Sequence, residues 1–249
     1  MSVQLTDKVV WITGAGKGLG RTIAHGVLSA GATVVATART LDSLESLREE
    51  YPAGRVLVAP GSVATESDVE RITSQISSEF AQLDGLVNCA GVSPSFDRSE
   101  RIGIDTFRAI LETNVVGSFI CAQQAGRLML TQGFGSIINV SSIHGQNGYP
   151  RISAYAASKG AISALTKTLA VEWADRGVRV NTLAPGYFDT DLSHKLLESS
   201  WGDDIRRRTP MGRTGEPDEL IGAVTYLLSD SANYTTGSTI TVDGGWSAW

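Results

Sequence analysis

The chain has 249 residues, of which 42% are hydrophobic and 19% charged, and its formal net charge is −5. This composition is typical of a packed globular protein and excludes a disordered chain. Because no basic run is present, we expect neither nucleic acid nor an anionic membrane as a partner. The first apolar run follows Asp7 and Lys8, and no apolar stretch could span a bilayer, so we expect a cytoplasmic protein without a signal peptide.

Cysteine and histidine usage bears on redox compartment and metals. Cys89 and Cys121 lie in apolar segments, which predicts buried thiols in a reducing compartment rather than a disulfide framework. The three histidines are scattered, so no metal site of recognisable spacing is expected.

Short apolar strands alternate with helices along the chain. We expect strands at residues 8–13, 32–38, 55–59, 85–89, 135–140, 178–183 and 238–242. We expect helices at 18–30, 41–50, 66–80, 104–130, around Tyr155 and at 218–228, with a looser polar segment at 186–213. This alternation predicts an α/β fold with a doubly wound parallel sheet of about seven strands, helices on both faces and a single domain over residues 1–249.

A glycine-rich turn, Thr-Gly-Ala-Gly-Lys-Gly-Leu-Gly at residues 13–20, joins the first strand to the first helix. Glycines let a phosphate approach the backbone closely, and a helix N-terminus offers N–H groups and a positive dipole end. A doubly wound sheet binds dinucleotides at this place. We therefore expect cofactor contacts from Gly14, Gly16, Lys17, Gly18, Leu19 and Gly20.

Tyr155 and Lys159 lie four residues apart and share one face of a predicted helix. A phenol has an ordinary pKa of about 10, and a nearby ammonium lowers it. The pair could therefore serve as a tuned acid and base. The pattern alone is short and common, so an ordinary surface pair is the alternative.

In their order and spacing, the motifs resemble those of the short-chain dehydrogenase/reductase family over nearly the whole chain. The turn at 13–20, Asn-Cys-Ala-Gly at 88–91 and Tyr-x-x-x-Lys at 155–159 are each similar to a family motif. Ser142 lies 13 residues before Tyr155, the family's spacing for its catalytic serine, and Asn114 falls where the family keeps a catalytic asparagine. The stretches at 185–190 and 242–245 are also similar.

The resemblance implies a Rossmann-fold oxidoreductase in which Tyr155 exchanges a proton with the substrate. Lys159 would lower the pKa of Tyr155 and bind the nicotinamide ribose, while Ser142 would hydrogen-bond the reacting oxygen. Asn114 would anchor a water, and a plain helix kink is its alternative role. Further cofactor contacts are implied at Ser62, Val63, Asn88, Ala90, Gly91, Pro185, Gly186 and Thr190. Two positions depart from the family pattern, because Ser62 stands in place of an adenine-binding Asp and Cys89 in place of Asn.

NADP(H) is the expected cofactor. Ala38 stands at the end of the second strand, where NAD sites carry an acidic residue. Arg39 follows it and Lys17 lies in the glycine turn, and such cations suit a 2′-phosphate. The alternative is that Arg39 stacks on the adenine of NAD.

The substrate is expected to be a hydroxylated small molecule. The loop at 144–151 and the start of the segment at 187–213 are rich in hydrogen-bonding groups, which fit such a ligand better than an aliphatic chain. We expect His144, Tyr149 and Tyr187 at the substrate and a lid at 187–213. The gluconate 5-dehydrogenase branch looks similar, so the hypothesis is oxidation of a secondary alcohol on a sugar, sugar acid or polyol. The alternatives are 3-oxoacyl thioester reduction, general carbonyl reduction and a catalytically inactive dinucleotide-sensing scaffold.

Several side chains keep two interpretations. His144 could touch substrate or be a bystander, and Arg151 could pair a sugar-acid carboxylate or be solvated. The arginines at 206–208 could form a solvated face or an anion site. Trp246 and Trp249 are expected in a subunit interface or over a neighbouring site.

We expect a homotetramer, with a dimer as the second choice. The small residues Ala161, Ala164 and Thr168 of the Tyr155 helix would allow close helix approach across a two-fold axis. The alternative is that they pack only on the sheet.

Overall fold

Seven parallel strands form one central sheet in the order β3-β2-β1-β4-β5-β6-β7. A computed structural model describes residues 4–190 and 193–248 of the chain. The strands are β1 (Val9–Thr13), β2 (Thr33–Thr37), β3 (Val56–Val58), β4 (Gly85–Asn88), β5 (Gly135–Val140), β6 (Val178–Pro185) and β7 (Thr239–Val242). Strand order reverses between β1 and β4, the switch point at which such sheets bind ligands. The predicted doubly wound sheet is confirmed.

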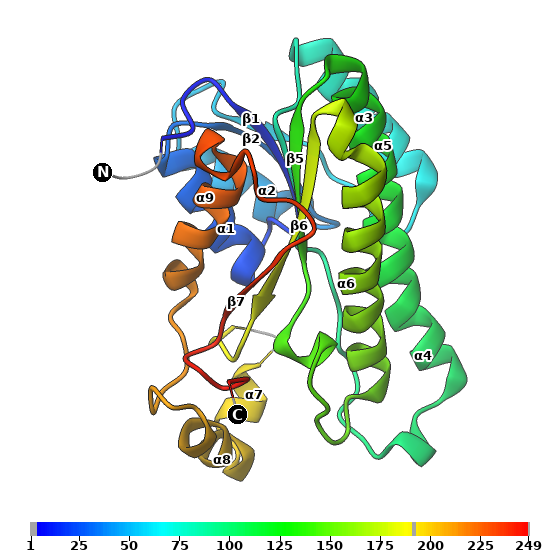
Figure 1. Ribbon diagram of the computed structural model, residues 1–249, viewed down its shortest axis with the longest axis vertical. Helices are drawn as coiled ribbons and strands as arrows, with labels where there is room; N and C mark the ends of the chain where they lie inside the picture. Colours follow the sequence, from blue (N-terminus) through cyan, green and yellow to red (C-terminus); the bar gives the residue numbers. More distant parts are fainter. Residues whose placement is uncertain (1–3, 191–192, 249) are drawn as a thin grey trace.

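Helices cover both faces of the sheet, as Figure 1 shows. One face carries α1 (Gly18–Ser29), α2 (Leu41–Glu49) and α9 (Ile221–Leu228). The other face carries α3 (Glu66–Glu79), α4 (Ile104–Leu111), α5 (Gly117–Gln132) and α6 (Ser153–Trp173). Short 3-10 turns lie at Ser99–Arg101, Ile143–Gly145, Ala174–Arg176, Pro217–Leu220 and Asp230–Ala232. None of the described helices is both long and apolar enough to cross a bilayer.

The side chains of each strand alternate between two cores, because successive residues of a strand point to opposite faces. In β1, Val10 and Ile12 pack in the core beneath α1, α2 and α9. Val9 and Trp11 pack in the core beneath α3, α5 and α6. Strands buried on both faces are the reason that the sequence shows short continuous apolar runs.

The single helix expected at 104–130 is divided by a π-helical turn. Residues Glu112–Val116 form this turn between α4 and α5, and Asn114 lies at its centre. Such turns are rare and occur frequently at functional sites. One extra residue per turn changes neither the composition nor the apolar spacing enough to be detected in the sequence.

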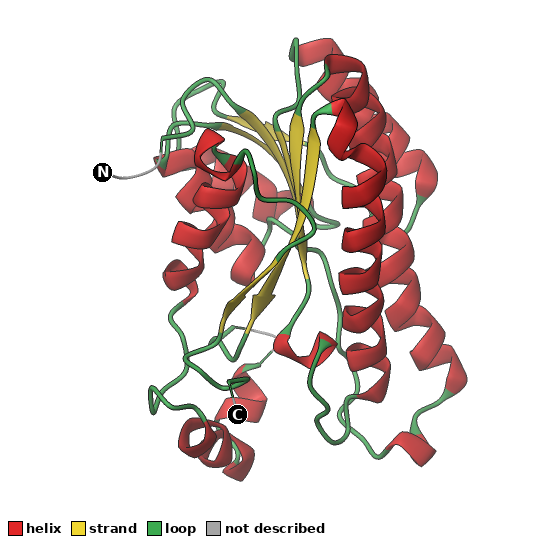
Figure 2. Cartoon of the chain, viewed as in Figure 1, coloured by secondary structure: helices red, strands yellow, loops and turns green. Residues whose placement is uncertain are grey.

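The segment expected to be loose carries two short helices, α7 (His194–Leu197) and α8 (Ser200–Arg208). They lie beyond the carboxyl ends of β6 and β7 (Figure 2). Leu197 and Ile205 are buried between them and the rest of the chain. This edge of the sheet is where the expected catalytic and cofactor residues gather.

Candidate active site

The glycine turn after β1 is packed so tightly that side chains are excluded from it. Gly14 has φ of +72°, and a Cβ on it would lie 3.0 Å from the Cα of Ala90. A Cβ on Gly20 would lie 2.2 Å from the carbonyl oxygen of Gly14. The turn leads directly into the N-terminus of α1, where N–H groups and the helix dipole favour an anion. The cradle therefore fits a dinucleotide phosphate.

Thr13 fastens this turn to the end of β4. Its Oγ1 accepts hydrogen bonds from the backbone N–H groups of Cys89 and Ala90, both at 3.1 Å. Asn88, expected among the cofactor contacts, directs its amide elsewhere. It donates to Asn139 Oδ1 at 2.9 Å and to the Ser118 carbonyl at 3.0 Å. The Asn88 side chain thus joins β4 to β5 and α5 and fixes the end of β4 beside the glycine turn.

The end of β2 adjoins the glycine turn. A Cβ on Gly16 would lie 3.2 Å from the Cβ of Ala38, so the position expected to select the cofactor does border the phosphate cradle. Arg39 is exposed, and no ion pair of its guanidinium is found within the part of the chain that the structure describes. Lys17 is exposed in the turn itself.

The remaining expected cofactor contacts line the same edge of the sheet. Ser62 N–H donates to Asp68 Oδ2 at 2.9 Å, and Val63 packs against Gly117 at the start of α5. On the β6 side, Gly186 N–H donates to the Val242 carbonyl at 2.9 Å, directly after Pro185. Thr190 Cβ lies 3.8 Å from the Cβ position of Gly18, so this segment reaches over the start of α1.

Tyr155 lies near the start of α6 and interacts with Ser142, the second of the two serines that follow β5. Burial raises the pKa of Tyr155 to about 12, although the hydrogen bond with Ser142 lowers it. The net pKa of Tyr155 in the chain alone is therefore raised rather than lowered as expected, because desolvation of the phenolate is the largest effect. At neutral pH Tyr155 is a protonated phenol, ready to donate.

Lys159 is buried one helical turn after Tyr155. Its Nζ donates to the Val140 carbonyl at 2.7 Å and lies 5.6 Å from the centroid of the Tyr155 ring. Burial lowers the pKa of Lys159 to about 8, so it remains mostly cationic at neutral pH. A Cβ on Gly91 would lie 3.6 Å from this Nζ and 3.4 Å from Asn114 Oδ1, which places the three residues around one point.

Asn114 is held by hydrogen bonds from the π-helical turn. Its Oδ1 accepts from the Val92 N–H at 2.8 Å, and its Nδ2 donates to the Val92 carbonyl and to Ser158 Oγ, both at 3.0 Å. The amide thus ties α4 and α5 to the loop after β4 and to α6. The place of Asn114 in the π turn also agrees with the helix-kink alternative.

Aromatic rings surround His144 at the mouth of the site. The ring centroids of Tyr149, Tyr187 and Trp246 lie 5.2, 5.4 and 5.3 Å from that of His144. His144 Nε2 and the Tyr187 hydroxyl are hydrogen-bonded at 2.9 Å. Burial, and to a smaller extent the charge of Arg208, lower the pKa of His144 to about 4 against a hydrogen bond with Asn147 that raises it, so the imidazole is neutral at pH 7. We call these four residues the aromatic cluster.

Trp246 contacts its own chain's site rather than a subunit interface. It is 1% exposed and packs against the other three members of the aromatic cluster. Trp249 lies outside the described residues. An outer layer follows, in which Trp201 of α8 packs on Tyr149 with a centroid distance of 6.0 Å, and Arg151 lies 5.7 Å from the Trp201 ring.

The arginines at 206–208 do not behave alike. Arg206 and Arg207 pair with Asp203 and Asp204 one turn earlier in α8. Arg208 instead lies over the Trp246 ring, 4.1 Å from its centroid. All three are at least partly exposed, and Arg208 differs only in that it stacks on Trp246 instead of pairing with a carboxylate of α8. The sequence held a signal for this difference, because the residue three before Arg208 is Ile205 and offers no carboxylate.

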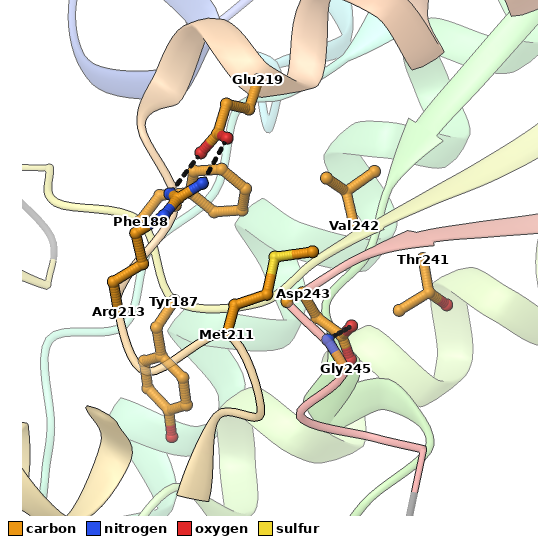
Figure 3. Close-up of a pocket in the computed structure, with 11 residues that line it drawn as sticks. Tyr187, Phe188, Met211, Arg213, Glu219, Thr241, Val242, Asp243 and Gly245 are labelled. Atoms are coloured by element: carbon orange, nitrogen blue, oxygen red, sulfur yellow. Dashed lines mark hydrogen bonds and ion pairs between the residues drawn. The ribbon is translucent and has the colours of Figure 1, made fainter. Parts of the chain in front are cut away.

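A cavity of about 410 Å³ lies beside the cluster and shares only Tyr187 with it. Figure 3 shows the Arg213–Glu219 ion pair on its wall and the Tyr187 hydroxyl directed away from that pair. None of Ser142, Tyr155 and Lys159 lines this cavity. We therefore assign the chemistry to the Tyr155 side of Tyr187, where the ionisable groups meet.

Thiols and acidic groups add no second centre. Burial raises the pKa of Cys89 to about 11 and that of Cys121 to about 12, so both are neutral thiols. Within residues 4–190 and 193–248, no group of three or more His, Cys, Asp or Glu side chains could hold a metal ion.

Comparison with known proteins places the chain in a family. A short-chain dehydrogenase model described as enoyl-(acyl carrier protein) reductase matches residues 14–247. The chain belongs to the short-chain dehydrogenase/reductase family. It is an oxidoreductase that acts on CH–OH groups of a small molecule with an NAD(P) cofactor.

Similar proteins include enzymes of sugar and of fatty-acid chemistry. Galactitol 2-dehydrogenase (L-tagatose-forming) of Cereibacter sphaeroides is 38% identical over 96% of this chain and 94% of its own. The 3-oxoacyl-[acyl-carrier-protein] reductase of a Synechocystis species is 34% identical over 97% of both chains. The crystal structure of a gluconate 5-dehydrogenase from Burkholderia cenocepacia in complex with NADP and tartrate has a TM-score of 0.94 and 34% identity, covering 99% of this chain and 98% of that one.

Proposed function

We propose that this enzyme is NADP(H)-dependent and interconverts a secondary alcohol and a ketone on a sugar, sugar acid or polyol, with Tyr155 as general acid and base. The observation that carries the proposal is the meeting of Tyr155, Ser142 and Lys159 beside a cluster of aromatic rings with polar tips.

Tyr155 supplies the proton in the proposed reaction. In reduction, its protonated phenol donates to the carbonyl oxygen as that oxygen becomes an alkoxide. In oxidation, the phenolate of Tyr155 accepts the hydroxyl proton and becomes the phenol. The buried Lys159 cation, 5.6 Å from the ring, stabilises that phenolate, which is also what remains after Tyr155 has donated its proton in reduction. Ser142 holds the phenol by a hydrogen bond and positions the reacting oxygen. Asn114 hydrogen-bonds Val92 and Ser158. It thereby fixes both the loop that follows β4 and the helix α6 relative to these groups.

The cradle after β1 suits the NADP(H) pyrophosphate, and bound NADP(H) supplies the hydride chemistry. Arg39 and Lys17 border the ribose position and would bind the 2′-phosphate, since no carboxylate stands at Ala38. Gly91, Pro185, Gly186 and Thr190 line the nicotinamide end. The NADP complex of the gluconate 5-dehydrogenase supports this choice of cofactor.

The aromatic cluster favours a hydroxylated substrate. Tyrosine, histidine and tryptophan each offer an apolar face for the C–H side of a sugar and a polar tip for its hydroxyls. A site with such buried polar groups rejects an analogue that leaves them unpaired. The names of the galactitol and gluconate dehydrogenases support the same substrate class.

We propose that residues 187–213 act as a lid and that the enzyme is a cytoplasmic homotetramer, with a dimer as the alternative. The lid packs through Trp201 on Tyr149 and on Phe96, with centroid distances of 6.0 and 5.5 Å, so it spans the mouth of the site. Ala164 and Thr168 are exposed on α6, which supports a helix contact between subunits.

A substrate panel tests the proposal. The purified protein is mixed with NADPH and 5-ketogluconate, other ketoses or an acetoacetyl thioester, and loss of nicotinamide absorbance gives kcat/KM. A ketose or keto acid should be the best substrate. A kcat/KM for the thioester well above that for every ketose would move the enzyme to acyl reduction. A protein that binds NADPH and turns over nothing would be the inactive scaffold.

A further inference from the structure

Arg208 is an exposed cation beside the aromatic cluster that the proposed reaction does not use. It ends α8, and its guanidinium lies 4.1 Å from the centroid of the buried Trp246 ring. Its charge acts on His144, Tyr149 and Tyr187, which are three of the four members of the aromatic cluster. Trp246 links Arg208 to the rest of the cluster, because its ring centroid lies 5.3 Å from that of His144 and 6.0 Å from that of Tyr187.

The donors of Arg208 remain available for a ligand. Stacking on an aromatic face uses the flat side of a guanidinium and leaves its five N–H donors in the plane. Among the residues that the structure describes, no carboxylate pairs with Arg208, whereas Arg206 and Arg207 each have one. A planar fork of N–H donors matches a carboxylate in a bidentate manner.

The same place holds a second polar group that lacks a partner. Trp246 is 1% exposed, and its Nε1 is buried without a hydrogen-bond partner within the described part of the chain. A buried donor without a partner costs free energy of folding, and in native proteins such groups are rare and often have a functional reason. An indole N–H can only donate, so it calls for an acceptor oxygen, as the guanidinium does.

Among the residues that the structure describes, no acid forms an ion pair with Arg208, and the nearby Asp243 carboxylate accepts from Gly245 and Ser247 instead. Lys159 adds a second cation at the Tyr155 end. Asp204 acts on Tyr149, but it is already paired with Arg207. Two cations on either side of the aromatic cluster would attract an anionic substrate.

We propose that Arg208, held against Trp246, binds the carboxylate of the substrate, so that the enzyme acts on a sugar acid in preference to the matching neutral polyol. This inference rests on the proposed function and narrows it to one substrate class. Arg151, 5.7 Å from the Trp201 ring in the outer layer, takes no part in this contact.

Matched ligand pairs that differ only at C1 test the inference: gluconate and glucitol, galactonate and galactitol, and mannonate and mannitol. Binding of each to NADP-loaded protein is measured by calorimetry, and kcat/KM is measured in parallel. Arg208→Met should weaken binding of the best acid at least tenfold, mainly through KM in the kinetic assay, and change its polyol less than threefold. Arg208→Lys should lose part of the effect, since it keeps the charge and loses the planar fork.

Arg207→Met is the matched control, since it removes a neighbouring cation that pairs with Asp204, and it should bind acid and polyol as the wild type does. Equal weakening of acid and polyol in Arg208→Met, or no heat of binding with any acid, would overturn the inference. So would an effect of Arg208→Met confined to acyl-carrier thioesters, which would indicate a phosphate or protein contact. Turnover of polyols without any preference for acids would overturn this inference and leave the proposed function intact. Binding of acids without turnover of any alcohol or ketone would refute the proposed function and leave the carboxylate contact intact.

Discussion

The Nζ of Lys159 donates to the carbonyl oxygen of Val140 at 2.7 Å, which places a cation at the end of β5 and beneath the ring of Tyr155. Burial lowers the pKa of Lys159 from its ordinary 10.5 to about 8. Folding therefore disfavours the ammonium form of Lys159 relative to the unfolded chain, although the cation still predominates at pH 7. Such a penalty is tolerated at sites where the charge has a chemical task.

This lowered pKa makes stability depend on pH. Between about pH 8 and 10.5 the unfolded chain holds a proton that folded Lys159 has released, so this group makes the free energy of unfolding rise with pH. The free energy of unfolding by urea, measured without cofactor at pH 7 and pH 9, should therefore rise by about 1 kcal/mol more in the wild type than in Lys159→Met. The exposed Lys167 of the same helix is the control, and Lys167→Met should behave as the wild type does.

Cys89 and Cys121 oppose this trend as pH approaches 9 and above. Their pKa values are raised in the folded chain, so the thiols ionise first in the unfolded chain and the free energy of unfolding falls. Both cysteines are present in the wild type, Lys159→Met and Lys167→Met, so their contribution to the pH dependence cancels when the three are compared. A pH dependence that is the same in wild type and Lys159→Met would show that the lysine titrates normally.

Tyr155→Phe should remove turnover and leave the cofactor site intact. The variant keeps the buried ring and loses only the hydroxyl that exchanges the proton. General acid and base groups contribute about 10²–10⁴-fold, so kcat should fall by at least about 100-fold. NADPH affinity, followed by nicotinamide fluorescence, should change less than threefold. Tyr234→Phe is the control at a fully exposed tyrosine, and a Tyr155→Phe rate above about a tenth of wild type would refute the assigned role.

The fold could be predicted because its strands are short, apolar and buried on both faces, as Val9 to Ile12 of β1 illustrate. The π turn around Asn114 could not, since one extra residue in a helix leaves the apolar period almost unchanged. The helices α7 and α8 were also missed. They are short and polar, and burial of Leu197 and Ile205 against tertiary neighbours, rather than local periodicity, stabilises them.

The site was predictable where its residues follow strands. Parallel strands bring their carboxyl ends to one edge, so Gly14, Ala90 and Ser142 meet without any long-range information. The contact between Arg208 and Trp246 has no such signal, because a helix end and the chain's last segment approach each other only in the fold. Positive φ values at Gly244 and Gly245, which direct that segment, are also invisible in the sequence.

The close contact at Gly20 gives a sharp test of the phosphate cradle. Gly20→Ala would place a Cβ 2.2 Å from the Gly14 carbonyl oxygen, so the turn must shift. We expect NADPH affinity to fall at least tenfold.

Gly222→Ala in α9 is the matched control, because its Cβ would meet nothing within 4 Å. It should keep full affinity and gain roughly 0.5–1 kcal/mol in unfolding free energy, since alanine is the better helix former. Equal NADPH affinity in both variants would argue against the cradle.

The exposed side of α6 should be a subunit contact. Ala157, Ala164 and Thr168 are exposed along it, and Val171 is 83% exposed. A charge in a close helix contact cannot be solvated, so Ala164→Glu should convert the oligomer to a smaller species in light scattering at micromolar concentration. Ser78→Glu on the exposed side of α3 should not change the oligomer. A wild-type monomer would defeat the prediction, and so would an unchanged oligomer in Ala164→Glu.

Cofactor preference should depend on two adjacent residues after β2. The Cβ of Ala38 lies 3.2 Å from the Cβ position of Gly16, so a carboxylate there would stand beside the ribose that follows the phosphate cradle. Such a carboxylate binds the ribose hydroxyls of NAD and repels a 2′-phosphate. Arg39→Ile removes a guanidinium that would otherwise pair with that phosphate. The double variant Ala38→Asp/Arg39→Ile should therefore lower the ratio of kcat/KM for NADP to that for NAD by at least 100-fold, with each single variant contributing part of the change.

Arg127→Ile, at an exposed arginine of α5, should leave the ratio unchanged. A wild-type enzyme that prefers NAD, or an Arg39→Ile variant that loses NAD and NADP activity equally, would mean that Arg39 stacks on the adenine instead of binding the phosphate.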